Sequence, residues 1–139
     1  MYVAAFFALV FGALVGLFMA LRHFQGKESG KAVGIMHGFW TVTGTALLAV
    51  GLAEVEASWG WWVLVGLLAT AAGGAFLFYR QLKGEPWPGV VIVAHGALGI
   101  AAVVVLGLWI GGLRETGVED QGMDADVPSQ TIENEPVDV

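Results

Sequence analysis

Four long runs of apolar residues, separated by short polar segments, make up most of the chain. The runs cover residues 2–21, 32–53, 59–79 and 89–113, and no charged residue interrupts any of them. A helix needs about 20 apolar residues to cross the hydrocarbon core of a bilayer, and each run has that length. The pattern therefore predicts an all-α integral membrane protein, a four-helix bundle with the lipid bilayer as its solvent.

The composition agrees with a membrane protein. Hydrophobic residues make up 57% of the chain and charged residues only 13%, whereas about 25% charged is usual in soluble domains. The chain has no cysteine, which excludes disulfides, iron–sulfur clusters and thiolate-ligated haem. No lysine or arginine precedes the first run and no small-residue cleavage site follows it, so we expect a retained span and not a cleaved signal peptide.

The charge of the chain is concentrated at its C-terminal end. Residues 114–139 carry eight acids and one base, a net charge of −7, and residues 1–113 sum to +1. The tail has few large apolar residues, so it cannot bury enough surface to fold alone. We expect a transmembrane domain over 1–113 and a disordered acidic tail over 114–139, for which docking on a basic partner is an alternative. The charge balance argues against nucleic acid as a partner.

The polar segments between the runs differ in charge. Segments 22–31 and 80–85 hold the basic residues, whereas the turn at 54–58 holds two acids and no base. Because short cytoplasmic loops are enriched in lysine and arginine, we expect both basic loops in the cytoplasm and both termini outside. The expected location is a bacterial or archaeal cytoplasmic membrane.

The chain matches itself when its first half is laid on its second half. Residues 1–55 align without a gap on residues 59–113, and scarce residue types match as well as apolar ones. The scarce pairs are Arg22 with Arg80, Gly26 with Gly84, and His37 with His95. The match predicts two tandem helical-hairpin repeats, related by a pseudo-two-fold axis along the membrane normal. Residues that this alignment pairs are called equivalent below.

Each repeat places one histidine inside its second apolar run. His37 and His95 lie about six residues into their runs, roughly 9 Å deep at 1.5 Å per residue. Ionisable residues inside a membrane are costly and often functional. The repeat predicts that the two imidazoles lie at one depth and face each other. Thr41, one turn beyond His37, is expected to bond back to its own helix.

The surroundings of the two histidines favour haem b as the ligand. Two histidines can serve as axial ligands of a haem iron. Gly38 and Gly96 follow the histidines directly, and glycine leaves room for a flat ligand to approach the helix. Arg22 and Arg80 end the partner helices near the same level, where they could pair with the two propionates. Zinc is disfavoured, since it prefers four ligands and no third candidate lies at that depth.

On these residues the chain resembles the small four-helix membrane b-type cytochromes with di-histidine haem ligation. The resemblance rests on His37, His95 and their surroundings within 1–113, and it is one of architecture. It implies an electron-transfer protein or a haem-binding subunit, with quinone or another membrane or respiratory subunit as partner, working alone or as a homo- or hetero-oligomer. Many of those cytochromes hold two haems on four histidines. Only one pair lies in the membrane here, so a two-haem relay is not expected.

Other readings of the same residues stay open. The histidines could be a packing or proton-active polar pair in a small, non-catalytic accessory subunit of a larger membrane complex. Ligation of another metal, contact with a quinone, and a proton site in a transporter are further alternatives. His23 is expected in a loop, away from any ligand. No serine–histidine–acid set and no intramembrane carboxylate is present, so an electron carrier or subunit fits better than a stand-alone enzyme.

Overall fold

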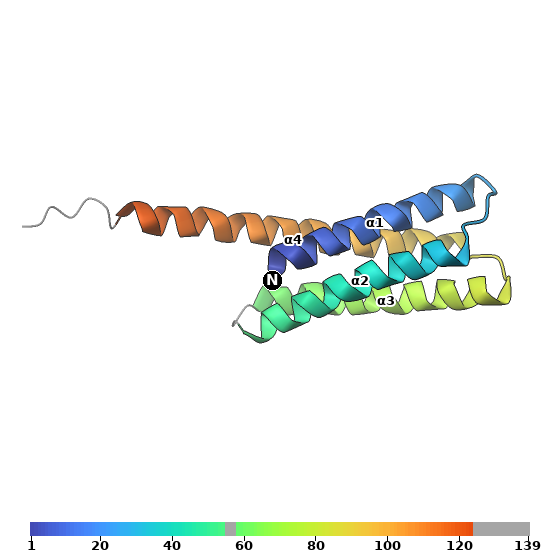
Figure 1. Ribbon diagram of the computed structural model, residues 1–139, viewed down its shortest axis with the longest axis horizontal. Coiled ribbons are helices and arrows are strands. Elements are labelled where there is room, and N and C mark those ends of the chain that lie inside the picture. The colour runs from blue at the N-terminus through green and yellow to red at the C-terminus, as the bar shows by residue number, and fades with distance from the viewer. Residues whose placement is uncertain (55–57, 124–139) are drawn as a thin grey trace, which may run out of the picture.

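The protein is a set of four long helices packed side by side. The computed structural model describes the backbone of residues 1–54 and 58–123 and the side chains of residues 1–54 and 60–112. Within these residues all regular structure is helical, as predicted (Figure 1). All four helices are long and apolar enough to cross a membrane. They are α1 (Tyr2–Phe24), α2 (Lys31–Ala53), α3 (Ser58–Lys83) and α4 (Gly89–Met123).

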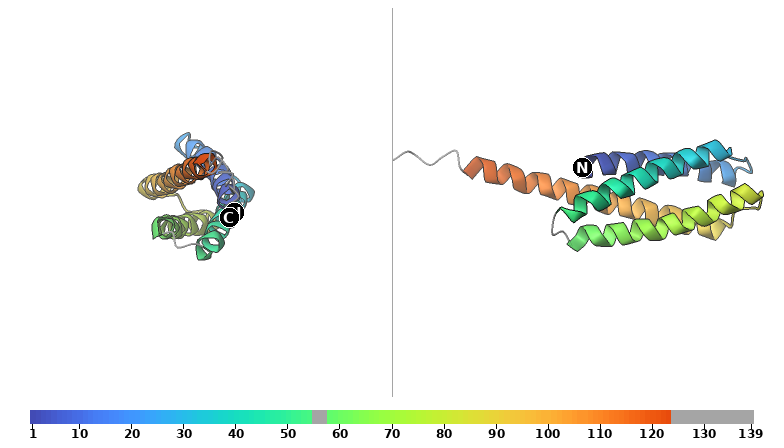
Figure 2. Two further views of the ribbon diagram at one scale, coloured as in Figure 1. Left: turned by 90° about the vertical axis from the view of Figure 1, so that its left-hand side faces the viewer. Right: turned by 60° about the horizontal axis from the view of Figure 1, so that its bottom comes forward.

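The helices form a closed ring. Helix α1 packs against α2 and α4, and α3 packs against the same two neighbours. Figure 2 shows the ring in the view along the helices. The α1–α2 and α3–α4 connections lie at one end, and the N-terminus lies at the other (Figure 1). This order places α2 and α4, which carry the two histidines, opposite each other across the ring.

A small apolar core fills the end of the ring near the N-terminus. Leu48 on α2 and Leu106 on α4 are both fully buried, and they are equivalent residues of the two repeats. No polar or charged side chain is buried in the part of the chain whose burial is described. The remaining members of the core cluster are Ala5, Leu9, Leu52, Val63, Leu64, Leu67 and Ala102.

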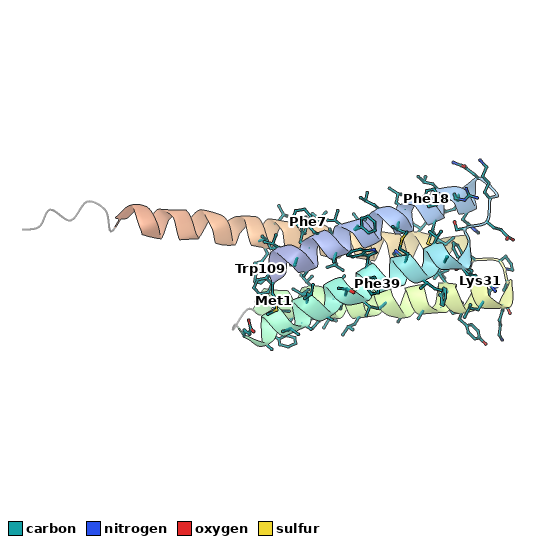
Figure 3. All side chains as sticks on the ribbon, in the orientation of Figure 1. Met1, Phe7, Phe18, Lys31, Phe39 and Trp109 are labelled. Atoms are coloured by element: carbon teal, nitrogen blue, oxygen red, sulfur yellow. The ribbon has the colours of Figure 1, made fainter. Side chains whose placement is uncertain are left out.

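The outer surface of the ring is also apolar. Phe7 is 64% exposed, Phe39 is 61% exposed and Phe18 is 50% exposed, and Figure 3 shows where these three residues lie along α1 and α2. Large exposed side chains of this kind occur along every helix. Soluble monomers rarely expose apolar patches wider than a few hundred Å², so this surface suits lipid and not water.

Helices α1 and α3 run further than their apolar runs. The expected ends were residues 21 and 79, but α1 continues to Phe24 and α3 to Lys83. The first polar residue therefore does not end either helix, and each arginine guanidinium lies back over an aromatic ring one turn earlier, 5.8 Å from the ring centre. An arginine can cover apolar surface with its stem while its charge reaches outward. His23, expected in a loop, therefore lies in the last turn of α1.

A glycine in the left-handed region follows the last residues of α1 and of α3. Gly26 has φ 70° and Gly84 has φ 69°. The N–H of Lys27 donates to the carbonyl of Arg22, and the N–H of Glu85 donates to the carbonyl of Arg80. This pattern is the Schellman motif, which satisfies carbonyls at a helix end and favours glycine because it has no Cβ. The matched Gly26 and Gly84 are thus explained as helix stops.

Helix α4 is longer than expected. The tail was predicted to be disordered from residue 114, but the helix continues to Met123 and projects beyond the other three helices (Figure 1). Extending an existing helix costs far less than starting one, and no proline occurs between Gly89 and Val127 to stop it. Residues 124–139 lie outside the described residues.

In each hairpin a glycine on one helix packs against a threonine on the other. The glycine is on the first helix in one hairpin and on the second helix in the other hairpin. In the first hairpin a Cβ on Gly12 of α1 would lie 2.6 Å from the methyl group of Thr41 on α2. In the second, the methyl group of Thr70 on α3 lies 3.5 Å from the place of a Cβ on Gly99 of α4. Gly12 is equivalent to Thr70, and Thr41 is equivalent to Gly99. One threonine thus lies next to one glycine in both hairpins, tightly in the first hairpin and at an ordinary contact distance in the second.

This exchange predicts a compensated pair of substitutions. Gly12→Thr should destabilise the protein by about 1–3 kcal/mol because the new side chain overlaps Thr41. Adding Thr41→Gly should recover most of that loss, since it recreates the arrangement of the second hairpin. A double-mutant cycle on unfolding free energies in detergent measures the coupling. Gly66→Thr, where a Cβ meets nothing within 4 Å, is the control, and strictly additive effects would contradict the prediction.

Candidate functional site

The two membrane-region histidines lie together on the diagonal of the ring. His37 is six helical steps from Lys31, the first residue of α2, and His95 is six steps from Gly89, the first residue of α4. Both are therefore about 9 Å from the helix start. Their ring centroids are 6.0 Å apart and the ring planes meet at 72°. The expectation that the two imidazoles lie next to each other is confirmed, and their equal depth in a membrane stays a prediction.

One nitrogen of each histidine is held by a backbone carbonyl of the neighbouring helix. His37 Nδ1 lies 2.8 Å from the carbonyl oxygen of Gly12, and His95 Nδ1 lies 2.8 Å from that of Thr70. A carbonyl oxygen can only accept, so each Nδ1 carries the hydrogen and donates it. In a neutral imidazole the other nitrogen, Nε2, then keeps an unshared electron pair. The site thus offers two Nε2 electron pairs from opposite helices.

A glycine lies against each imidazole one turn after the carbonyl that the imidazole contacts. A Cβ on Gly16 would lie 2.8 Å from His37 Cε1, and a Cβ on Gly74 would lie 2.9 Å from His95 Cε1. The sequence match had paired Gly16 with Gly74 without assigning either to the site. Only the packing of α1 on α2 and of α3 on α4 shows that both glycines touch the histidines.

The glycines that follow the histidines have open space around them. A Cβ on Gly38 or on Gly96 would meet no atom within 4 Å. Their expected role, leaving room beside the histidines, is compatible with this space, and contact with a ligand stays a prediction. The Thr41 hydroxyl donates to the carbonyls of His37 and Gly38 at 3.1 Å, which confirms that it bonds back to its own helix.

The two arginines fasten the loops that follow them. Arg22 donates from Nε and Nη2 to the carbonyl of Glu28. Arg80 donates from Nε to the carbonyl of Pro86 and forms a 3.4 Å ion pair with Glu85. These contacts were not foreseen from the sequence. A guanidinium has five N–H donors, so the loop contacts leave further donors on each arginine, and propionate pairing stays a prediction.

The connections between the hairpins differ at the loop end of the ring. His23 of α1 stacks on Trp87, with ring centroids 5.4 Å apart. At the matched place, Gln81 of α3 donates to the carbonyl of Ser29 at 2.7 Å. His23 is equivalent to Gln81, and Trp87 is equivalent to Ser29. The same two positions of the repeat are therefore joined once by an aromatic stack and once by a hydrogen bond. His23 contributes nothing to the paired imidazoles, as expected.

The donor set of the site is limited to the two imidazoles. No group of three or more histidine, cysteine, aspartate or glutamate side chains that could hold a metal ion occurs within the described part of the chain. A bare zinc ion in a structural site takes four protein ligands. A haem iron already has four equatorial ligands in its macrocycle and needs only two axial ones, so the two imidazoles fit haem better than a bare ion.

Comparison of the chain with protein-family models, with curated proteins and with solved structures finds no match.

Proposed function

We propose that the protein spans a membrane with four helices that arose by tandem duplication of one hairpin. Four long apolar helices, the shortest of which have 23 residues, and their exposed large apolar side chains support insertion. Contacts that recur at equivalent positions support duplication: both histidine–carbonyl bonds, both glycine stops and both arginine–loop contacts. The basic loops lie on the cytoplasmic side and both termini outside, as the positive-inside rule favours.

We propose further that this bundle holds one haem b between His37 and His95 and serves as an electron carrier or as the haem-binding subunit of a larger complex. The observation that carries the proposal is the pair of imidazoles 6.0 Å apart, each with its Nδ1 engaged by a carbonyl. Metal-bound histidines almost always donate their second ring N–H to a carbonyl, carboxylate or water. Both histidines have that arrangement.

The spacing of the rings suits a shared metal ion. Imidazole nitrogens lie about 2.0–2.1 Å from a metal such as zinc, which places two rings on opposite sides of one ion with centroids roughly 6 Å apart. The ring centroids of His37 and His95 are 6.0 Å apart. When bound, the haem supplies reversible one-electron transfer.

The chain's own residues have three roles in this proposal. His37 and His95 would hold the haem through Nε2, and the carbonyls of Gly12 and Thr70, which accept the Nδ1 hydrogens, would orient the imidazoles and raise their basicity. Apolar side chains line the helices around the half-buried histidines, and inside a bilayer they would keep water away from a bound haem. Arg22 and Arg80 lie at the loop end, where two carboxylates of a haem would meet cationic partners.

The alternative is a small accessory subunit in which the histidines only join helices. It is favoured by the same hydrogen bonds, because His37 ties α2 to α1 and His95 ties α4 to α3. Interhelical hydrogen bonds of this kind contribute about 0.6–2 kcal/mol in membranes. Colourless protein that assembles fully with a partner subunit after His95→Gln would favour this alternative.

An absorption spectrum tests the haem directly. Protein purified in detergent from haem-replete cells is expected to show the Soret and visible bands of a six-coordinate low-spin haem in its oxidised and reduced forms. Quantification as the pyridine haemochrome should give one haem per chain. Protein that is colourless and does not take up added haemin would contradict the proposal.

A further inference from the structure

Two glycines that lie against the histidines have a role that helix packing alone does not require. Gly16 of α1 and Gly74 of α3 are equivalent residues of the two repeats, and a Cβ on either would lie under 3.0 Å from an imidazole carbon. For Gly16 the Cβ would also lie 3.1 Å from His37 Nδ1. Carbon atoms in contact keep about 3.5–4.0 Å, so a methyl group there would have to displace the ring.

The geometry of the helix explains why this position matters. The carbonyl of residue i in an α-helix points toward the N–H of residue i+4. Gly12 and Thr70, whose carbonyls accept the histidine bonds, each precede one of the two glycines by a single helical turn. A side chain at the i+4 position stands beside that carbonyl. When residue i+4 is a glycine, the imidazole can occupy the space that a side chain would take. Its Nδ1–H then donates to the carbonyl oxygen, which also accepts the backbone N–H of residue i+4.

We propose that Gly16 and Gly74 are positioning residues for His37 and His95. Each keeps its imidazole on the neighbouring carbonyl, which holds the hydrogen on Nδ1 and leaves the electron pair of Nε2 for the metal that the site would bind. The ring positions alone do not depend on the proposed function, but the consequence for a bound haem does. A Cβ at either position moves the ring off its carbonyl and weakens the Nδ1 hydrogen bond.

The consequence for the haem has a definite sign. An Nδ1–H that donates to a carbonyl makes the imidazole a stronger electron donor. Stronger donation stabilises the oxidised iron, so loss of the hydrogen bond raises the reduction potential. Gly16→Ala and Gly74→Ala should each raise the potential, and the double variant should raise it further.

The first arm of the test needs no haem. Nuclear magnetic resonance of 15N-histidine-labelled protein reports which ring nitrogen carries the hydrogen. In the wild type, His37 and His95 should both show the Nδ1–H tautomer. In Gly16→Ala, only His37 should shift toward a mixture of tautomers, and in Gly74→Ala, only His95. An unchanged His37 signal in Gly16→Ala together with an unchanged His95 signal in Gly74→Ala would overturn the proposal.

The second arm is a redox titration of the haem-loaded protein, with two controls. Gly66→Ala adds a methyl group to α3 where nothing lies within 4 Å, and Gly73→Ala adds one at an ordinary 3.6 Å from His95. Both controls should keep the wild-type potential and tautomers. If Gly16→Ala does not accumulate, Gly74→Ala tests the same contact on the other histidine. Haem-free wild-type protein would remove the proposed function, and the tautomer arm would still decide the role of the glycines.

Discussion

Alanine in place of His37 or of His95 is expected to abolish six-coordinate haem in the purified protein. Each variant removes one of the two imidazoles, and no third histidine, cysteine, aspartate or glutamate forms a metal-binding group with them within the described residues. Loss of an outer-shell partner typically costs about 10–100-fold in metal affinity, and loss of a direct ligand should cost more. The measurement is haem content per chain together with the oxidised and reduced spectra.

The pair of variants also separates the two proposed functions. If the histidines bind haem, the single variants should lose colour or become five-coordinate, and the double variant should be colourless. His23→Ala is the matched control, since His23 stacks on Trp87 and not on the paired imidazoles. A His37→Ala/His95→Ala protein that retains the wild-type spectrum would refute ligation by this pair.

Leu106→Ala is expected to cause the largest loss of stability among single core substitutions. Leu106 is a fully buried member of the apolar cluster, as is its equivalent residue Leu48. Leu→Ala in a packed core costs about 2–5 kcal/mol, depending on the cavity that remains. In a membrane the lost dispersion contacts supply this cost, because lipid offers no hydrophobic gain from burial.

Leu108→Ala is the control on the same helix, since Leu108 is 73% exposed and should exchange one lipid-facing surface for another. Thermal unfolding in detergent, followed by circular dichroism, should show a clearly lower midpoint for Leu106→Ala and nearly no change for Leu108→Ala. Equal losses would mean that the apolar cluster does not hold the helices together.

The four helices could be predicted from the sequence because each depends on local properties. Length and hydrophobicity locate an apolar span wherever it lies in the fold, and the predicted starts at residues 2, 32, 59 and 89 agree with the structure to the nearest residue or its neighbour. Helix ends were less accurate. For α1 and α3 a glycine that adopts a positive φ decides the end, and a hydropathy pattern does not show that conformation.

The closeness of His37 and His95 could also be predicted, because the two histidines are equivalent in the repeat and lie equally far from the starts of two parallel helices. The partners of the histidines could not. Which carbonyl each Nδ1 reaches depends on how α1 and α3 are rotated about their axes, and that rotation is set by packing.

The sequence by itself thus determined the helices of the described residues and the place of each histidine about six residues from the start of its helix. Only the tertiary structure shows that Gly16 and Gly74 touch the imidazoles. It also shows that Gly12 packs against Thr41 in the first hairpin and that Thr70 packs against Gly99 in the second. The physical reason is that hydrophobicity acts on each helix separately. Contact between helices depends on which residues meet when two surfaces approach closely, and that is a property of pairs of helices.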